Sequence, residues 1–148
     1  MEPDLPTEAE INIHDSLDER WAVKNFLGKT LEEAEAQFAE NFLAYSEDLM
    51  CMGPRAFCFY IKAAISYLRS HSSRGDADAL NSFCSTVDYR LDYESDALAD
   101  IVPMMQEAVD ALIRDYERFE ASDQVYGSLP KKLARLQCRL KAYPSDSE

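Results

Sequence analysis

The side chains best suited to metal binding or nucleophilic catalysis are few in this 148-residue chain, and they lie far apart. A di-metal site in a helical bundle needs Glu-x-x-His pairs on facing helices. His14 and His71 are the only histidines, and neither follows a glutamate by three residues. The cysteines form no C-x-x-C pair suited to zinc, and the four isolated glycines make no phosphate-binding loop. We therefore expect a protein without metal, cofactor or enzymatic activity.

The most regular pattern of chemically active side chains is acidic. Asp88, Asp92, Asp96 and Asp100 recur every four residues. On one continuous helix they would stack on one side, and each like-charged pair would cost roughly 0.2–0.5 kcal/mol. A new helix that begins at Ser95 would instead place Asp96 at a positive helix end. The acids form either a solvated, well-capped face or a surface that attracts a basic partner and accelerates its association.

In the second interpretation, the tyrosines interleaved with these acids would supply the amphipathic contact area that binding hot spots use. Such a surface suits a protein that masks a basic partner, for example the active face of a nuclease. The predicted partner-binding residues are Asp88, Tyr89, Asp92, Tyr93, Glu94, Asp96, Asp100 and Asp110.

A second candidate site lies in the aromatic segment MGPRAFCFYIKAAISYL, residues 52–68. Plotted on a helix, its apolar side chains cover nearly the whole circumference, which is typical of a helix surrounded by other helices. Either this helix is the centre of the core, or it lines a pocket in which Phe57, Tyr60 and Tyr67 meet a ligand.

The net charge of −13 argues against nucleic-acid binding, because neutralisation of phosphates supplies most of that affinity. The last 25 residues differ from the rest, since residues 124–148 hold five basic and two acidic side chains. We expect this basic last helix to lie on the acidic body. The longest apolar stretch, residues 56–68, is too short to span a bilayer. The acidic N-terminus resembles no signal peptide, so we expect a cytoplasmic, bacterial protein with reduced cysteines.

Helical periodicity and capping signals predict six helices, and no segment predicts a strand. Ser16 and Thr30 each begin a capping box with a glutamate three residues later. Trp21, Phe26 and Leu27 are predicted on the apolar side of the first helix. Pro103 either kinks the fifth helix or lies in the first turn of a new one. The predicted helices begin at Ser16, Thr30, Pro54, Asp76, Ser95 and Ser128.

The segments FLGKTLEEAEAQF and MGPRAFCFYIKAAISYL resemble an uncharacterised bacterial family of helical domains. In that family a box of the form (T/G)P-x-A-F-x-x-Y-(L/I) follows a helix of the form F-x-x-x-T-L-x-x-A. The matching positions are Phe26, Thr30, Leu31, Ala34, Gly53, Pro54, Ala56, Phe57, Tyr60 and Ile61. The family has no assigned activity, so the resemblance implies no catalytic residue.

These observations predict an all-α, compact single-domain bundle of about six mostly antiparallel helices. Residues 1–13 are predicted as a mobile acidic tail, residues 14–143 as the helical domain and residues 144–148 as a frayed end. The predicted function is that of a non-enzymatic protein-binding module, such as an immunity or inhibitor protein that masks a basic toxin. The alternative is a small-molecule-binding or enzymatic bundle that uses the aromatic helix, and a third hypothesis is a homo-oligomer.

Overall fold

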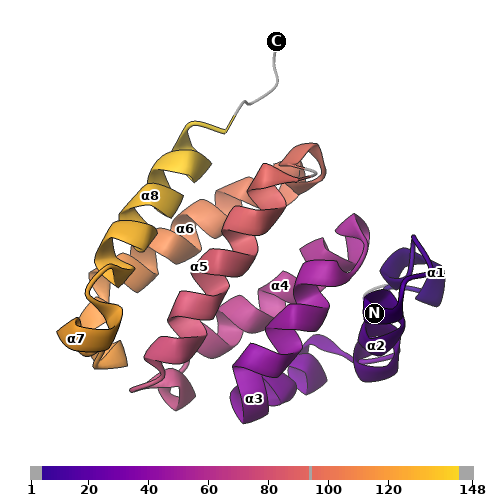
Figure 1. The fold of residues 1–148 in the computed structure, drawn as a ribbon, viewed down its shortest axis with the longest axis horizontal. Coiled ribbons are helices and arrows are strands. Elements are labelled where there is room, and N and C mark those ends of the chain that lie inside the picture. Colours follow the sequence, from indigo (N-terminus) through magenta and orange to yellow (C-terminus); the bar gives the residue numbers. More distant parts are fainter. Residues whose placement is uncertain (1–4, 94, 144–148) are drawn as a thin grey trace. The chain divides into compact units, whose positions relative to one another are not determined.

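A computed structural model describes residues 5–93 and 95–143 of the chain. Every regular element in these ranges is a helix, which confirms the predicted all-α bundle (Figure 1). Glu94 and the predicted frayed end lie outside the described residues. The chain divides into two compact units, residues 1–67 and 68–148. Each unit is described by itself below.

The first unit contains four α-helices. These are α1 (Glu8–Ile11), α2 (Leu17–Phe26), α3 (Leu31–Cys51) and α4 (Pro54–Leu68), of which the last ends at the boundary between the units. Helix α2 packs against α3, and α1 packs against α2. Both predicted capping boxes are present, at Ser16 and at Thr30.

Helix α1 lies where the sequence predicted a mobile tail. Thr7 and Glu10 form a third capping box, and the side chain of Ile11 is completely buried. The backbone N–H of Gly53 donates a hydrogen bond of 2.9 Å to the carbonyl of Ile11. The buried Ile11, this backbone hydrogen bond and an ion pair between Glu10 and Arg55 fix the segment, and so short an element has no periodicity that a sequence pattern could show.

Helix α3 is interrupted in its middle, although its apolar spacing predicted one continuous helix. Asn41 has φ −158° and ψ 81°, outside the helical region. Its side-chain Oδ1 accepts a hydrogen bond from the N–H of Ala44 at 3.2 Å, as an N-cap residue does. Asn41 therefore ends one helical segment and caps the next. Phe38 and Phe42 on either side of it are nevertheless both buried.

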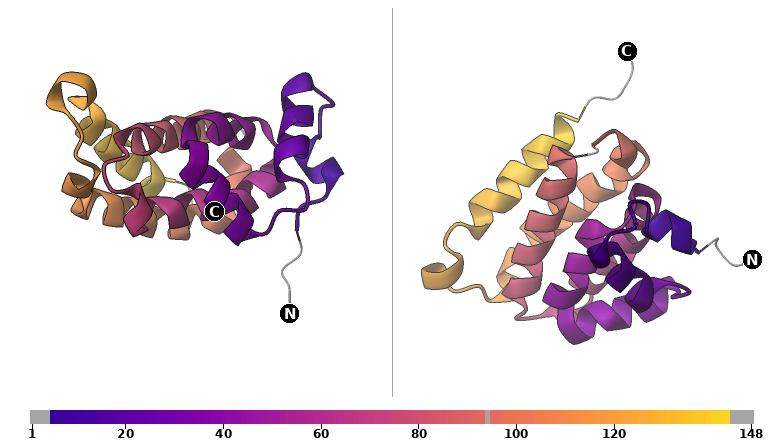
Figure 2. Two further views of the ribbon diagram at one scale, coloured as in Figure 1. Left: turned by 90° about the horizontal axis from the view of Figure 1, so that it is seen from below. Right: turned by 45° about the vertical axis from the view of Figure 1, so that its right-hand side comes forward.

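The second unit is built from three longer helices, α5 (Ala77–Asp92), α6 (Val102–Arg114) and α8 (Leu129–Lys141), which lie side by side (Figures 1 and 2). Helix α8 packs against both α5 and α6. Its four leucines at helical spacing are buried as the sequence predicted: Leu129, Leu133, Leu136 and Leu140.

Short elements connect these helices. They are η1 (His71–Ser73), η2 (Ser95–Ile101) and η3 (Tyr116–Phe119), which are 3-10 helices, and α7 (Asp123–Tyr126). Pro103 lies in the first turn of α6, so the second of the two alternatives for this residue is correct. Among the described residues, no helix combines the length and the apolar character that a membrane span requires.

Candidate functional site

Three of the predicted partner-binding acids are engaged by helix α8. The guanidinium of Arg139 donates to Asp88 Oδ1 at 3.0 Å and to Asp92 Oδ1 at 2.8 Å. Gln137 Nε2 donates to Asp110 Oδ1 at 2.6 Å. The basic last helix thus lies on acids of α5 and α6, as its charge predicted, and these acids stabilise the second unit internally.

The remaining part of the predicted surface is open. Helix α5 ends at Asp92 and η2 begins at Ser95, so the four aspartates do not stack on one continuous helix. Tyr89 and Tyr93 are 43% and 59% exposed. Their ring centroids lie 4.8 Å apart with an interplanar angle of 46°. Asp96 and Asp100 in η2 are also exposed.

The aromatic helix α4 places its predicted pocket residues in the core. Phe57, Tyr60 and Tyr67 are all buried. The Tyr60 hydroxyl donates to the carbonyls of Phe26 at 2.9 Å and Lys29 at 2.8 Å. Burial raises the pKa of Tyr60 to about 12. These contacts favour the core interpretation of α4 over the pocket interpretation, because the hydroxyl is already used by the protein.

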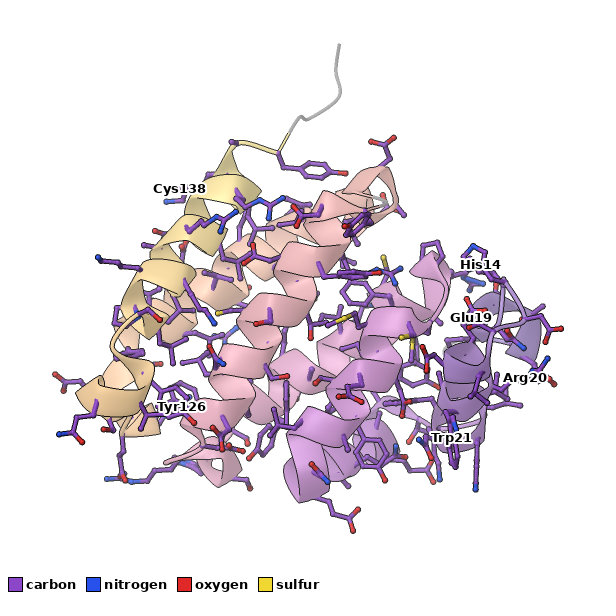
Figure 3. All side chains as sticks on the ribbon, in the orientation of Figure 1. His14, Glu19, Arg20, Trp21, Tyr126 and Cys138 are labelled. Atoms are coloured by element: carbon purple, nitrogen blue, oxygen red, sulfur yellow. The ribbon has the colours of Figure 1, made fainter. Side chains whose placement is uncertain are left out.

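A groove in the first unit was not predicted from the sequence. It has a volume of about 530 Å³ and lies between α2 and the second half of α3. The residues that give it its chemical character are Asp18, Trp21, Asn25, Glu47, Asp48 and Cys51. Trp21, which the sequence placed on the apolar side of its helix, is 50% exposed. Figure 3 shows it on α2 beside Arg20.

Asp48 is the most buried acid of this groove, with 9% of its surface exposed. Its Oδ2 accepts a hydrogen bond of 2.7 Å from Asn25 Nδ2. Burial raises the pKa of Asp48 most, and the charges of Glu47 and Asp18 raise it further against the hydrogen bond from Asn25. The pKa of the Cys51 thiol is raised by burial first and then by these same carboxylates. Negative charge is therefore concentrated here.

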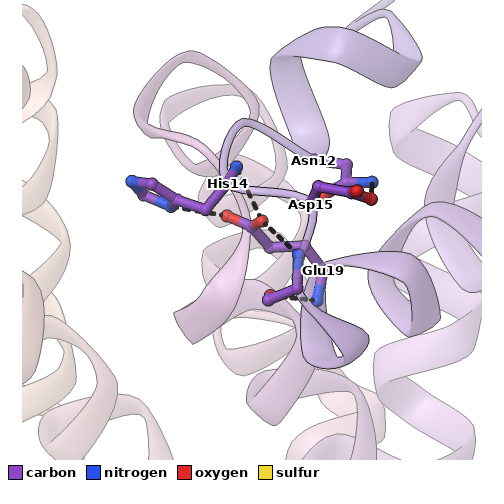
Figure 4. Close-up of polar contacts among 5 residues, drawn as sticks. Asn12, His14, Asp15 and Glu19 are labelled. Atoms are coloured by element: carbon purple, nitrogen blue, oxygen red, sulfur yellow. Dashed lines mark hydrogen bonds and ion pairs between the residues drawn. The ribbon is translucent and has the colours of Figure 1, made fainter.

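Beside this groove, Glu19 fixes the start of α2 (Figure 4). Its buried carboxylate accepts hydrogen bonds from the backbone N–H groups of His14 at 2.8 Å and Ser16 at 3.2 Å, and it contacts His14 Nδ1 at 2.9 Å. Burial by itself would raise the pKa of Glu19, but the contacts with His14 and Ser16 outweigh it and lower the pKa. We assign this cluster a structural role, since each of its hydrogen bonds closes the turn that leads into α2.

A second hollow of about 780 Å³ lies in the second unit, between the end of α4 and the end of α6. Arg118 at its edge donates to the carbonyls of Leu68 and Ser70 and to Ser73 Oγ. This guanidinium therefore holds the chain around η1 together. The charged residues lining the hollow carry both signs: Arg69, Arg114, Asp115, Glu117 and Arg118. Such a mixed lining selects no particular ligand charge.

Within the described ranges, no group of three or more His, Cys, Asp or Glu side chains is arranged to hold a metal ion. No protein-family model matches the chain, and no curated protein or solved structure shows significant similarity to it. The resemblance of residues 26–61 to a bacterial helical family stays a prediction. The candidate sites therefore depend on their own geometry, which offers the exposed Tyr89–Tyr93 pair in one unit and the acidic groove in the other.

Proposed function

We propose that the protein is a non-enzymatic module that binds a basic protein partner, with an immunity or inhibitor role as the specific form of this activity. The proposal includes a cytoplasmic location, where the four free thiols would stay reduced. The contact surface comprises Tyr89, Tyr93, Asp96 and Asp100. The observation that carries the proposal is the pair of exposed tyrosines, whose rings pack against each other in a tilted arrangement.

Two properties of this pair suit it to binding. Aromatic rings that already pack on each other lose little conformational freedom when a partner covers them. The exposed acids of η2, Asp96 and Asp100, come three and seven residues after Tyr93 in the chain, and carboxylates near an aromatic contact attract a basic surface. The guanidinium of Arg139 compensates part of the negative charge of Asp88 and Asp92. Asp96 and Asp100 therefore supply the negative charge that would attract a basic partner.

Affinity capture from the native cell lysate, at low and at high salt, tests the proposal. We expect a basic partner that is retained at low salt and released at high salt, because exposed charge pairs are screened. The double variant Asp96→Lys with Asp100→Lys should slow association of that partner about tenfold. The double variant Tyr89→Ala with Tyr93→Ala should accelerate its dissociation by a similar factor.

Glu107→Lys is the matched control, since Glu107 is an exposed acid on α6 and the substitution reverses the same charge elsewhere in the unit. It should leave both rates within about twofold of wild type, because Glu107 is not part of the proposed contact surface and a single exposed charge contributes little. If both double variants bind the captured partner as the wild type does, the Tyr89–Tyr93 surface is not the binding site.

A further inference from the structure

We propose that the groove between α2 and α3 binds an arginine side chain presented by a partner protein. The site belongs to the first compact unit, whereas Tyr89 and Tyr93 belong to the second, and it does not depend on the function proposed for that surface. The argument combines the charge of the groove, an unused hydrogen-bond acceptor and a half-exposed indole ring.

The charge of the groove is negative and uncompensated. Asp18, Glu47 and Asp48 line it, and none of the described residues that line it is basic. The surrounding unit has the same sign, since residues 1–67 hold 13 acidic and 5 basic side chains. An acidic hollow within an acidic unit attracts a cation from a distance and then holds it at close range.

Asp48 supplies the unused acceptor. Its carboxylate is nine-tenths buried in the groove wall, yet it receives one hydrogen bond from the described part of the chain, from Asn25 to Oδ2. The other carboxylate oxygen, Oδ1, is accessible from the groove that Asp48 lines, so it can accept a hydrogen bond from a further charged donor. A cationic N–H group in the groove would meet this requirement.

Trp21 supplies the aromatic surface. Its ring already binds a cation, because Lys24 Nζ lies over it at 4.6 Å from the ring centroid. An indole has two faces, and Trp21 lines both the groove and a neighbouring hollow formed with Leu17, Arg20 and Lys24. The ring is therefore placed to stack against a second cation on its groove side.

These features favour arginine over other cations. No group of described His, Cys, Asp and Glu side chains is arranged for a metal ion. A guanidinium is planar, stacks on an indole and presents five N–H donors to several carboxylates at once, whereas an ammonium is a compact, strongly hydrated charge. Leu17, which is 68% exposed beside Trp21, offers an apolar contact to the residues that flank such an arginine.

The test uses blocked tripeptides of the sequence Leu-X-Leu, in which X is arginine, lysine or the uncharged isostere citrulline. Trp21 is the only tryptophan, so its fluorescence reports directly on the groove. We expect the arginine peptide to change this fluorescence in a saturable manner. The citrulline peptide should bind at least about tenfold more weakly because it lacks the charge, and the lysine peptide should fall between the two.

Matched variants locate the binding. Asp18→Asn and Glu47→Gln alter exposed groove acids, and each should weaken binding of the arginine peptide about fivefold or more. Glu40→Gln, an exposed acid on α3 that does not line the groove, should leave it unchanged. The Tyr89→Ala with Tyr93→Ala variant should also bind the peptide normally, so failure of this inference and failure of the proposed function are distinguishable.

Three results would overturn the inference. The first is an absence of saturable change with the arginine peptide, and the second is equal binding of the citrulline peptide. The third is a dimer in sedimentation equilibrium that Asp18→Asn or Glu47→Gln dissociates, because a second copy of the chain would then occupy this face.

Discussion

The hydroxyl of Tyr60 provides the sharpest test of how the first unit is held together. It joins α4 to the turn after α2 by donating to the carbonyls of Phe26 and Lys29. The Phe26 carbonyl also accepts a hydrogen bond from the N–H of Lys29, so it would keep one partner without the hydroxyl. The Lys29 carbonyl accepts its hydrogen bond from Tyr60 and would lose it. Tyr60→Phe removes one oxygen atom and leaves the ring and its contacts in place.

We expect this substitution to lower the free energy of unfolding by about 0.5–1.5 kcal/mol, the net contribution of a typical hydrogen bond, because the bond to the Lys29 carbonyl is only partly buried. Urea unfolding followed by far-UV circular dichroism and by Trp21 fluorescence measures the change. Tyr93→Phe is the control, since this tyrosine is 59% exposed and its substitution should change stability by less than about 0.5 kcal/mol.

The same hydroxyl predicts a dependence on alkaline pH. The native pKa of Tyr60 is about 12, above its ordinary value, so the native state keeps the proton after the unfolded state has lost it. The stability that this hydroxyl contributes is complete below pH 10 and decreases as the pH rises to 12. The difference between wild type and Tyr60→Phe should therefore narrow over this range. A constant difference, or a Tyr60→Phe variant as stable as Tyr93→Phe, would refute the role assigned to the hydroxyl.

Two further predictions concern the start of the first unit. A Cβ at Gly53 would lie 2.2 Å from the carbonyl oxygen of Glu10, so Gly53→Ala should displace α1 at a cost of about 1–3 kcal/mol. Faster hydrogen exchange of residues 7–13 would report this displacement, and unchanged protection would contradict it. The native pKa of Glu19 is lowered, so its contribution is present above its ordinary value of 4.5 and is lost as the pH falls through the native pKa. Glu19→Gln should thus be less stable than wild type by about 1–3 kcal/mol at pH 7, with a gap that narrows on acidification; a gap that does not change as the pH falls would disprove this role.

Local sequence signals predicted much of the secondary structure. The capping boxes at Ser16 and Thr30 form as expected, because each requires only residues three positions apart. Helix α1 and the interruption at Asn41 were not predicted. Both depend on the packing of short segments, which gives no repeating pattern over the length of a helix.

The candidate sites were predictable to different extents. Tyr89 and Tyr93 lie at i and i+4 of one helix end, so their pairing follows from local geometry. The pairing of Asp88 and Asp92 with Arg139 was indicated only by the opposite charges of distant segments. The acidic groove could not be predicted from the sequence. Trp21 lies on the apolar side of its predicted helix, as a core residue would, and the chain has so many acids that no three of them form a distinctive pattern.

The sequence by itself determined the helical class, the positions of most helix starts and the sign of the charge on the body and on the last helix. These properties depend on neighbouring residues and on composition. Only the tertiary structure decided which polar groups are used internally and which are free. In the folded protein the Tyr60 hydroxyl is hydrogen-bonded to the carbonyls of Phe26 and Lys29 at the end of α2. The fold also brings Asp18 of α2 beside Glu47 and Asp48 of α3. Burial and hydrogen-bond partners depend on contacts between residues about 30 positions apart, and no periodicity along the chain encodes such contacts.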